Sequence, residues 1–146
     1  MASVRTHMDG AEITVTFDER TALMEVVKEL TPGVKNLTWK PYGDKKLDEE
    51  FSRYVGPEIE HNRATDLQML FEGLGAEGEK VVLTQAQAYA WLRGLNLLRL
   101  AAAKKLGIAD DNWEDSLPKE ARDRREYAML LTLGWLQEHL ISTLEN

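Results

Sequence analysis

Two long runs of helix-forming residues constrain the fold of this chain more than any other feature. The first run opens with Thr84-Gln85-Ala86-Gln87, which has the spacing of a capping box. In such a box the Thr hydroxyl and the Gln amide each satisfy a backbone N–H at the helix start. Ala, Leu and Gln then dominate, Lys104 and Lys105 suit the negative end of the helix dipole, and Gly107 stands where a C-terminal cap belongs. The pattern predicts a helix over residues 85–106.

The second run is the C-terminal helix, which we expect to start at Ser116 or Leu117 with Pro118 and to run nearly to the chain end. Gly94 and Gly134 lie inside the two runs, and a glycine within a helix costs ~1 kcal/mol relative to alanine. Such glycines mark close helix approaches. We therefore expect the two long helices to pack as antiparallel neighbours and to touch at both glycines. A broad apolar face on the last helix is made by Tyr127, Leu130, Leu131, Trp135, Leu136, Leu140 and Leu144.

The front of the chain has a different period. Residues 3–17 alternate between apolar and polar side chains around Asp9-Gly10, a pair typical of a type I′ turn between two strands. This predicts a β-hairpin in which Val4 lies opposite Val15 and that face is buried. Because a two-stranded ribbon is marginal alone, residues 81–83 are the candidate third strand.

Helices are expected between the hairpin and the first long helix. Asp18 has the position of an N-cap, and a helical apolar stripe follows it until Pro32-Gly33. We expect this stripe to pack on the hairpin. A short helix over residues 47–54 is predicted next, and Pro57 opens a further one.

The predicted fold is therefore mainly α, with a β-hairpin, and a short third strand as an addition, packed on a small bundle of helices dominated by two long antiparallel ones. At 146 residues the chain suits one domain over 1–146, with the hairpin at 3–17 and the helical part at 18–146. The first twenty residues have no signal-peptide core, and no run approaches ~18 apolar residues. With no cysteine, the chain fits a reducing compartment, so we expect a cytoplasmic protein that is not bound to a membrane.

Motifs for chemistry are not found. His7, His61 and His139 are far apart in the sequence and lack the spacing of zinc or di-iron sites. The acidic residues 110–115 lack the rhythm of a calcium loop, and neither a dinucleotide fingerprint nor a phosphate loop occurs. We expect no catalytic residues, no cofactor and no metal, and hence a protein that is not an enzyme.

The charge balance disfavours a nucleic-acid platform. The chain has 18 Lys and Arg against 25 Asp and Glu, a net charge of -7, whereas phosphate binding depends on clustered cations. One dense basic stretch is a candidate surface for a partner or for nucleic acid, although interleaved acids favour ion pairs along a solvated helix. It consists of Lys119, Arg122, Arg124 and Arg125.

The first long helix also carries a family resemblance. Residues 82–100 read VLTQAQAYAWLRGLNLLRL, and the shorter strings Leu106-Gly107-Ile108, Trp135-Leu136-Gln137-Glu138 and Glu50-Phe51-Ser52-Arg53-Tyr54 accompany them. Together they resemble an actinobacterial family, formerly a domain of unknown function, of which one branch is described as oxidative-stress transcriptional regulators of the AosR type. The resemblance implies transcriptional control together with an alternative sigma factor. The family's redox response is linked to paired N-terminal cysteines, which this chain lacks, so only the fold and the regulatory role carry over.

The leading expectation is thus a non-enzymatic cytoplasmic regulatory protein that acts through a protein partner such as a sigma factor. One alternative is a protein-binding adaptor with no DNA contact, and another is an enzyme of unrecognised class. Direct DNA contact stays open, and the surplus of helical apolar residues also allows a homodimer. The signal sensed and the surface that binds the partner are not evident from the residues.

Overall fold

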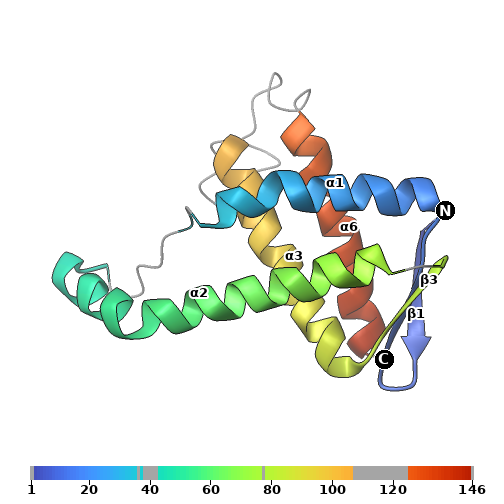
Figure 1. The fold of residues 1–146 in the computed structure, drawn as a ribbon, viewed down its shortest axis with the longest axis horizontal. Helices are drawn as coiled ribbons and strands as arrows, with labels where there is room; N and C mark the ends of the chain where they lie inside the picture. The colour runs from blue at the N-terminus through green and yellow to red at the C-terminus, as the bar shows by residue number, and fades with distance from the viewer. Residues whose placement is uncertain (1, 36, 38–42, 77, 107–124, 146) are drawn as a thin grey trace.

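The computed structural model describes residues 2–35, 37, 43–76, 78–106 and 125–145 of the chain. In chain order it contains two strands, two helices, a third strand and two further helices. Figure 1 shows α3 (Gln85–Leu106) and α6 (Arg125–Glu145) side by side and antiparallel, crossed by α1 (Phe17–Val34) and α2 (Lys45–Gly75). The three strands stand near the N-terminal end of α1. The prediction of a mainly helical fold with two long antiparallel helices and a β-hairpin is confirmed.

The sheet is antiparallel with the strand order β1-β2-β3. It is formed by β1 (Ser3–His7), β2 (Gly10–Thr14) and β3 (Lys80–Leu83). The third strand predicted near residues 81–83 is confirmed, and it pairs with β2. The sheet packs on α3 and α6, because Ala11 and Ile13 on one face of β2 are buried in the common core.

The predicted hairpin register was wrong by two residues. Val4 lies opposite Ile13, not Val15, and the loop consists of Met8 and Asp9. A shift of two residues leaves each side chain on its predicted face, because side chains alternate with period two. The shift arises because Met8 takes the positive φ of 53° that the turn requires, a conformation that sequence reasoning assigned to Asp9-Gly10.

Gly10 is needed for a different reason, its close approach to β3. A Cβ at this position would lie 2.0 Å from the carbonyl oxygen of Leu83. The residue belongs to β2 and pairs with His7. Glycine is therefore required here by the space between two strands and not by the turn conformation.

Helix α1 begins and ends differently from the prediction. Its N-cap is Thr16, which forms a capping box with Glu19, so Asp18 lies in the first turn. Pro32 is inside the helix, where its missing N–H removes one i→i−4 hydrogen bond, the one that the Lys28 carbonyl would accept. The buried stripe packs mainly on α3 and also contacts α2, so its expected packing on the hairpin was wrong. The stripe consists of Arg20, Leu23, Val27, Leu30 and Val34.

Helix α2 is one continuous helix where two were predicted. Asp44 caps it by accepting a hydrogen bond of 3.0 Å from the Leu47 backbone N–H, and Pro57 lies within it. In Figure 1 the first turns of α2 bend away from the rest of the helix. An internal proline is a common cause of such a bend, so Pro57 redirects the helix without ending it.

Helix α3 has the predicted bounds, and its capping box is present. The Thr84 hydroxyl accepts from the Gln87 backbone N–H at 3.2 Å, and the Gln87 side chain accepts from the Thr84 N–H at 2.9 Å. The start predicted for the last helix, at residues 116–118, lies outside the described residues, and α6 is described from Arg125. The α3–α6 pair is the most extensive helix packing among the described elements.

One hydrophobic cluster joins the sheet and the four helices. Trp91 of α3 is its largest fully buried side chain, with 1% of its surface exposed. In contrast, Leu131 and Trp135, assigned to the apolar face of the last helix, are 46% and 37% exposed. Within the described parts of the chain, none of the helices combines the length and apolarity that a membrane crossing requires.

Candidate functional site

The most distinctive concave surface lies between α1 and α2. The two helices are antiparallel here: Lys28 faces Phe71 near one end, and Arg63 faces Leu37 near the other. We call this concavity, lined by α1 and its end between residues 27 and 37 and by α2 between residues 60 and 71, the α1–α2 groove. Its volume is about 840 Å³, within the range of ligand and partner sites.

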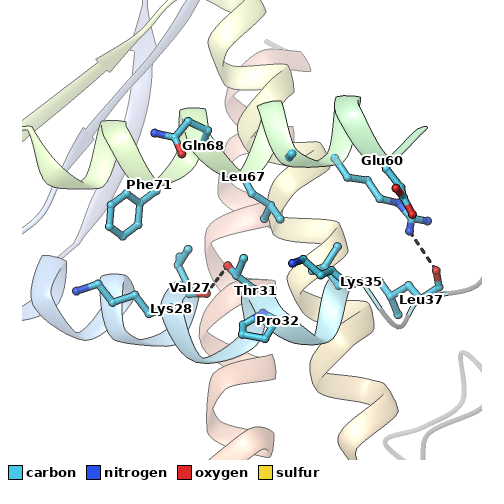
Figure 2. Close-up of a pocket in the computed structure, with 13 residues that line it drawn as sticks. Val27, Lys28, Thr31, Pro32, Lys35, Leu37, Glu60, Leu67, Gln68 and Phe71 are labelled. Carbon is cyan, nitrogen blue, oxygen red and sulfur yellow. Dashed lines mark hydrogen bonds between the residues drawn. The ribbon is translucent and has the colours of Figure 1, made fainter. Parts of the chain in front are cut away.

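The floor of the groove is apolar because both helices turn a regular stripe toward it. From α1 it receives Val27 and Val34, which are 3% and 4% exposed, and from α2 it receives Leu67, which is 8% exposed. Figure 2 shows side chains of the two helices directed toward one another across the gap. Phe71 is only partly buried and closes one end of the groove.

The rim of the groove is cationic. Lys28 of α1 and Lys35, the C-cap residue directly after α1, are exposed and one heptad apart, and Arg63 is half-buried on α2. The ammonium nitrogen of Lys28 stands 5.8 Å from the centre of the Phe71 ring, within cation–π range. Arg63 Nη1 donates a hydrogen bond of 3.1 Å to the Leu37 carbonyl oxygen. Glu60 is the single carboxylate among the lining residues, so the groove is locally positive on a chain of net charge -7.

A second cavity, of about 910 Å³, adjoins the groove along the bend of α2. The two cavities share Leu37, Glu60 and Arg63 in their linings. Carboxylates and a lysine from the first turns of α2 surround the second cavity, so it is more polar than the groove. The concave surface along α2 therefore changes from mixed charge near Pro57 to apolar and cationic toward Phe71.

A third cavity lies between α1 and α6 and is smaller, at about 480 Å³. Leu131, Trp135 and Leu23 contribute to its apolar lining. Trp135 also stacks on His139, with the ring centroids 4.3 Å apart, and the Trp135 carbonyl oxygen is 2.8 Å from His139 Nδ1. The Trp135 ring therefore packs along its own helix, and 37% of the residue's surface stays exposed.

The outer face of the sheet carries a compact charge cluster. Glu12 is 6% exposed and contacts Arg5 Nη2 at 2.8 Å, Lys80 Nζ at 3.5 Å and His7 Nδ1 at 3.7 Å. Partial desolvation raises the pKa of Glu12, but the hydrogen bonds and positive charges of Arg5 and Lys80 outweigh it, so the pKa lies below its ordinary value. The carboxylate acts as a shared counterion that holds the three strands in register.

The basic stretch predicted as a partner or nucleic-acid surface is only partly described. Lys119, Arg122 and Arg124 lie outside the described residues. Arg125 is the first residue of α6, and its Nη2 contacts Glu29 Oε2 of α1 at 3.0 Å. The described member of the stretch is thus engaged in an ion pair within the chain.

The two glycines predicted to bring the long helices together have different neighbours. Gly134 of α6 faces α3, where the Arg99 guanidinium lies 3.7 Å from a Cβ built on the glycine. Gly94 of α3 faces α2 instead, with the Asp66 carbonyl oxygen at 3.4 Å. The close approach at Gly94 is present, but it is to α2, so the prediction that Gly94 meets the last helix was wrong.

Sequence reasoning missed a close helix contact at Gly73. A Cβ at this position would lie 2.5 Å from Cζ2 of Trp91. Gly73 lies in the last turn of α2, where it makes room for the buried indole. The groove cations were missed as well, although Lys28 and Lys35 directly follow Val27 and Val34, and this repeat could have indicated a charged edge beside an apolar seam.

The three histidines lie on three different elements. His7 is on the sheet, His61 is on α2 and His139 is on α6. Among the residues that the structure describes, no three His, Asp or Glu side chains are grouped so that they could hold a metal ion. The acidic segment 110–115 lies outside these residues.

Comparison with known families gives one match. The family model described as "Domain of unknown function (DUF2017)" matches residues 1–144. The chain belongs to this family. No curated protein and no solved structure matches it. The DUF2017 match spans the sheet, the four helices that the structure describes and both sides of the α1–α2 groove, so the groove lies within the family domain.

Proposed function

We propose that this DUF2017 protein is a non-enzymatic regulatory protein that acts by binding another protein. The observation that carries the proposal is the α1–α2 groove, in which an apolar floor is bordered by Lys28, Lys35 and Arg63. Nucleic acid makes little use of an apolar floor, because its contacts are dominated by phosphates. Protein interfaces commonly combine a buried apolar centre with a charged rim.

The resemblance to oxidative-stress transcriptional regulators supports a more specific form of this proposal. In that form the protein resides in the cytoplasm and acts on transcription together with an alternative sigma factor. With no cysteine in the chain, the oxidant signal would reach it through the partner and not through a thiol of its own.

Affinity capture from host cells tests the proposed function. The tagged full-length chain is expected to recover a sigma factor or a polymerase component, with recovery changing between normal growth and peroxide treatment. Recovery of neither protein in both conditions would contradict the regulatory role. Sedimentation of the purified chain at micromolar concentration tests the homodimer, and a monomer throughout would exclude it.

The adaptor alternative, without DNA contact, is favoured by the net charge of -7 and by the Arg125–Glu29 ion pair. A DNA titration at rising salt separates the two forms. Direct phosphate contacts release counterions, so affinity must fall steeply as salt increases. Absence of salt-dependent binding supports action through protein contacts alone.

A further inference from the structure

We infer that the α1–α2 groove binds an acidic amphipathic helix of the protein partner. This inference rests on the proposed function, because it assumes that the partner is a protein. It adds the chemistry of the partner segment: apolar side chains along one face, with Asp or Glu at its edge. The inference follows from the spacing of the groove residues and from the placement of the charges.

The spacing is that of a helix-packing seam. On the α2 side the groove is lined at positions 60, 63, 64, 67, 68 and 71, and on the α1 side at 27, 28, 31, 32 and 34 and, just beyond the helix end, at 35 and 37. These intervals of three, four and seven residues are those at which one helix faces another. The two helices therefore present matching edges, between which a third helix can lay its apolar face.

The length of the seam agrees with this occupant. The α2 residues that line the groove span the segment from Glu60 to Phe71, which at 1.5 Å per residue corresponds to about 17 Å. A partner helix of about three turns has the same length. Such a helix presents anchors at i, i+3 or i+4 and i+7.

The charges indicate an acidic partner segment and argue against a lipid-like ligand that has only one charged headgroup. Lys28 of α1 and the C-cap residue Lys35 are seven residues apart, which places them about 10 Å apart along the helix axis. One carboxylate or phosphate headgroup cannot pair with both. Two acidic residues one heptad apart on a docked helix can do so, while Arg63 on the α2 side is hydrogen-bonded to Leu37, near the end where Lys35 lies.

Arg63 is already positioned at this end of the groove. Its hydrogen bond to the Leu37 carbonyl oxygen uses Nη1. A guanidinium has further N–H groups in the same plane, and these can donate to a carboxylate of the docked helix. Glu60, also on the rim, disfavours an acidic residue directly beside it, which sets the orientation of the partner helix.

The test uses the full-length chain and synthetic helical peptides of about three to four turns. One peptide carries Leu at i, i+3 and i+7 with flanking Glu one heptad apart, a second has Lys in place of Glu, and a third scrambles the first. Fluorescence anisotropy measures binding. We expect the acidic peptide to bind, the scrambled peptide not to bind, and affinity to decrease as salt rises.

Three protein variants locate the binding site. The double variant Lys28→Glu/Lys35→Glu should bind the acidic peptide with an affinity lower by about tenfold or more. It should also gain binding to the Lys peptide. The matched control Lys46→Glu/Arg53→Glu changes two exposed cations of α2 with the same heptad spacing and should leave affinity within about twofold. Ala64→Trp fills the groove without a change of charge and should also abolish binding.

Several results would overturn the inference. These are absence of acidic-peptide binding at millimolar concentration, equal affinity in all variants, tighter binding of a fatty-acid anion than of the peptide, or a self-association that Ala64→Trp abolishes. Capture with the Lys28→Glu/Lys35→Glu variant keeps the two proposals distinct. If this variant retains the transcription partner, the groove inference is wrong and the proposed function stands. If the peptide results hold but no transcription component is captured, the proposed function is wrong and the groove site stands.

Discussion

Asp66 of α2 accepts two hydrogen bonds from the guanidinium of Arg93 of α3, at 2.9 and 3.0 Å. The Asp66 side chain is 11% exposed and that of Arg93 is 60% exposed, so the pair joins a buried carboxylate to a cation at the surface. The hydrogen bonds with Asp66 raise the pKa of Arg93. Gly94 directly follows Arg93 in α3 and lets the backbone of α3 approach α2, since a Cβ at this position would lie 3.4 Å from the Asp66 carbonyl oxygen.

Arg93→Ala should destabilise the protein by about 1–3 kcal/mol, because it leaves the Asp66 carboxylate buried without its partner. Arg93→Lys should cost less, since it keeps the charge but cannot form both hydrogen bonds. Urea denaturation measures both. Arg53→Ala, at an exposed position of α2, is the control and should lie within about 0.5 kcal/mol of the parent. An equally small effect of Arg93→Ala would show that the pair adds nothing to stability.

Gly73→Ala and Gly134→Ala should change stability in opposite directions. At position 73 the new methyl group would meet the Trp91 ring at 2.5 Å, and overpacking of this kind costs about 1–3 kcal/mol. At position 134 the nearest neighbour is Arg99 at 3.7 Å, an ordinary contact, so alanine should gain up to about 1 kcal/mol from helix propensity. Thermal unfolding of the two variants provides the comparison, and a stabilised Gly73→Ala would refute the close contact with Trp91.

Met8→Gly should stabilise the hairpin by up to about 1 kcal/mol, because Met8 is 88% exposed and has a φ of 53°, which is unfavourable for a residue with a Cβ. Chemical denaturation at neutral pH measures the gain. Met8→Ala keeps the Cβ and serves as the control for loss of the side chain. A gain as large with alanine would mean that the backbone conformation is not the cause.

Gly10→Ala should destabilise the protein by about 3 kcal/mol, because its Cβ would collide with the Leu83 carbonyl oxygen. Gly10→Asn discriminates between the two explanations for this glycine. Asparagine tolerates a left-handed turn, so it would be accepted if the turn were the reason. We expect it to be at least as harmful as alanine, as judged by circular dichroism and urea midpoints.

Glu12 should make stability sensitive to acid. Its pKa is lower in the folded chain than the ordinary value of 4.5. Its contribution to stability is therefore fully present above pH 4.5 and is lost as the pH falls through the lower folded value. Glu12→Gln should be less stable than the parent above this range, and the difference should shrink below it. Urea unfolding on both sides of pH 4.5 measures the difference in stability between the two proteins. A difference that stays constant across that range would contradict the prediction.

Local signals were sufficient for much of the fold. The capping box of Thr84 and Gln87 identified the start of α3, because its hydrogen bonds involve residues only three positions apart. Proline was misread twice, at Pro32 and Pro57, since both lie inside helices where tertiary packing outweighs the local cost. The capping box of Thr16 and Glu19 was also a local signal, and it was passed over for Asp18.

The candidate site could not be found in the same way. Lys28 and Lys35 border a groove only because α2 lies antiparallel to α1, with Phe71 and Arg63 opposite them. Nothing near these residues in the sequence indicates which helix they face. The apolar stripe of α2 is equally ambiguous in the sequence, because in the structure part of it enters the core and part of it lines the groove.

The sequence by itself determined the helix and strand types, the inward and outward faces of the strands, the bounds of α3 and the absence of a thiol. These properties depend on composition or on residues within a few positions of one another. Only the tertiary structure decided the pairing of Val4 with Ile13, the neighbours of Gly94 and Gly73, and the assembly of the α1–α2 groove. Each of these depends on the separation of segments distant in the chain, which is set by how all the side chains of the core pack together.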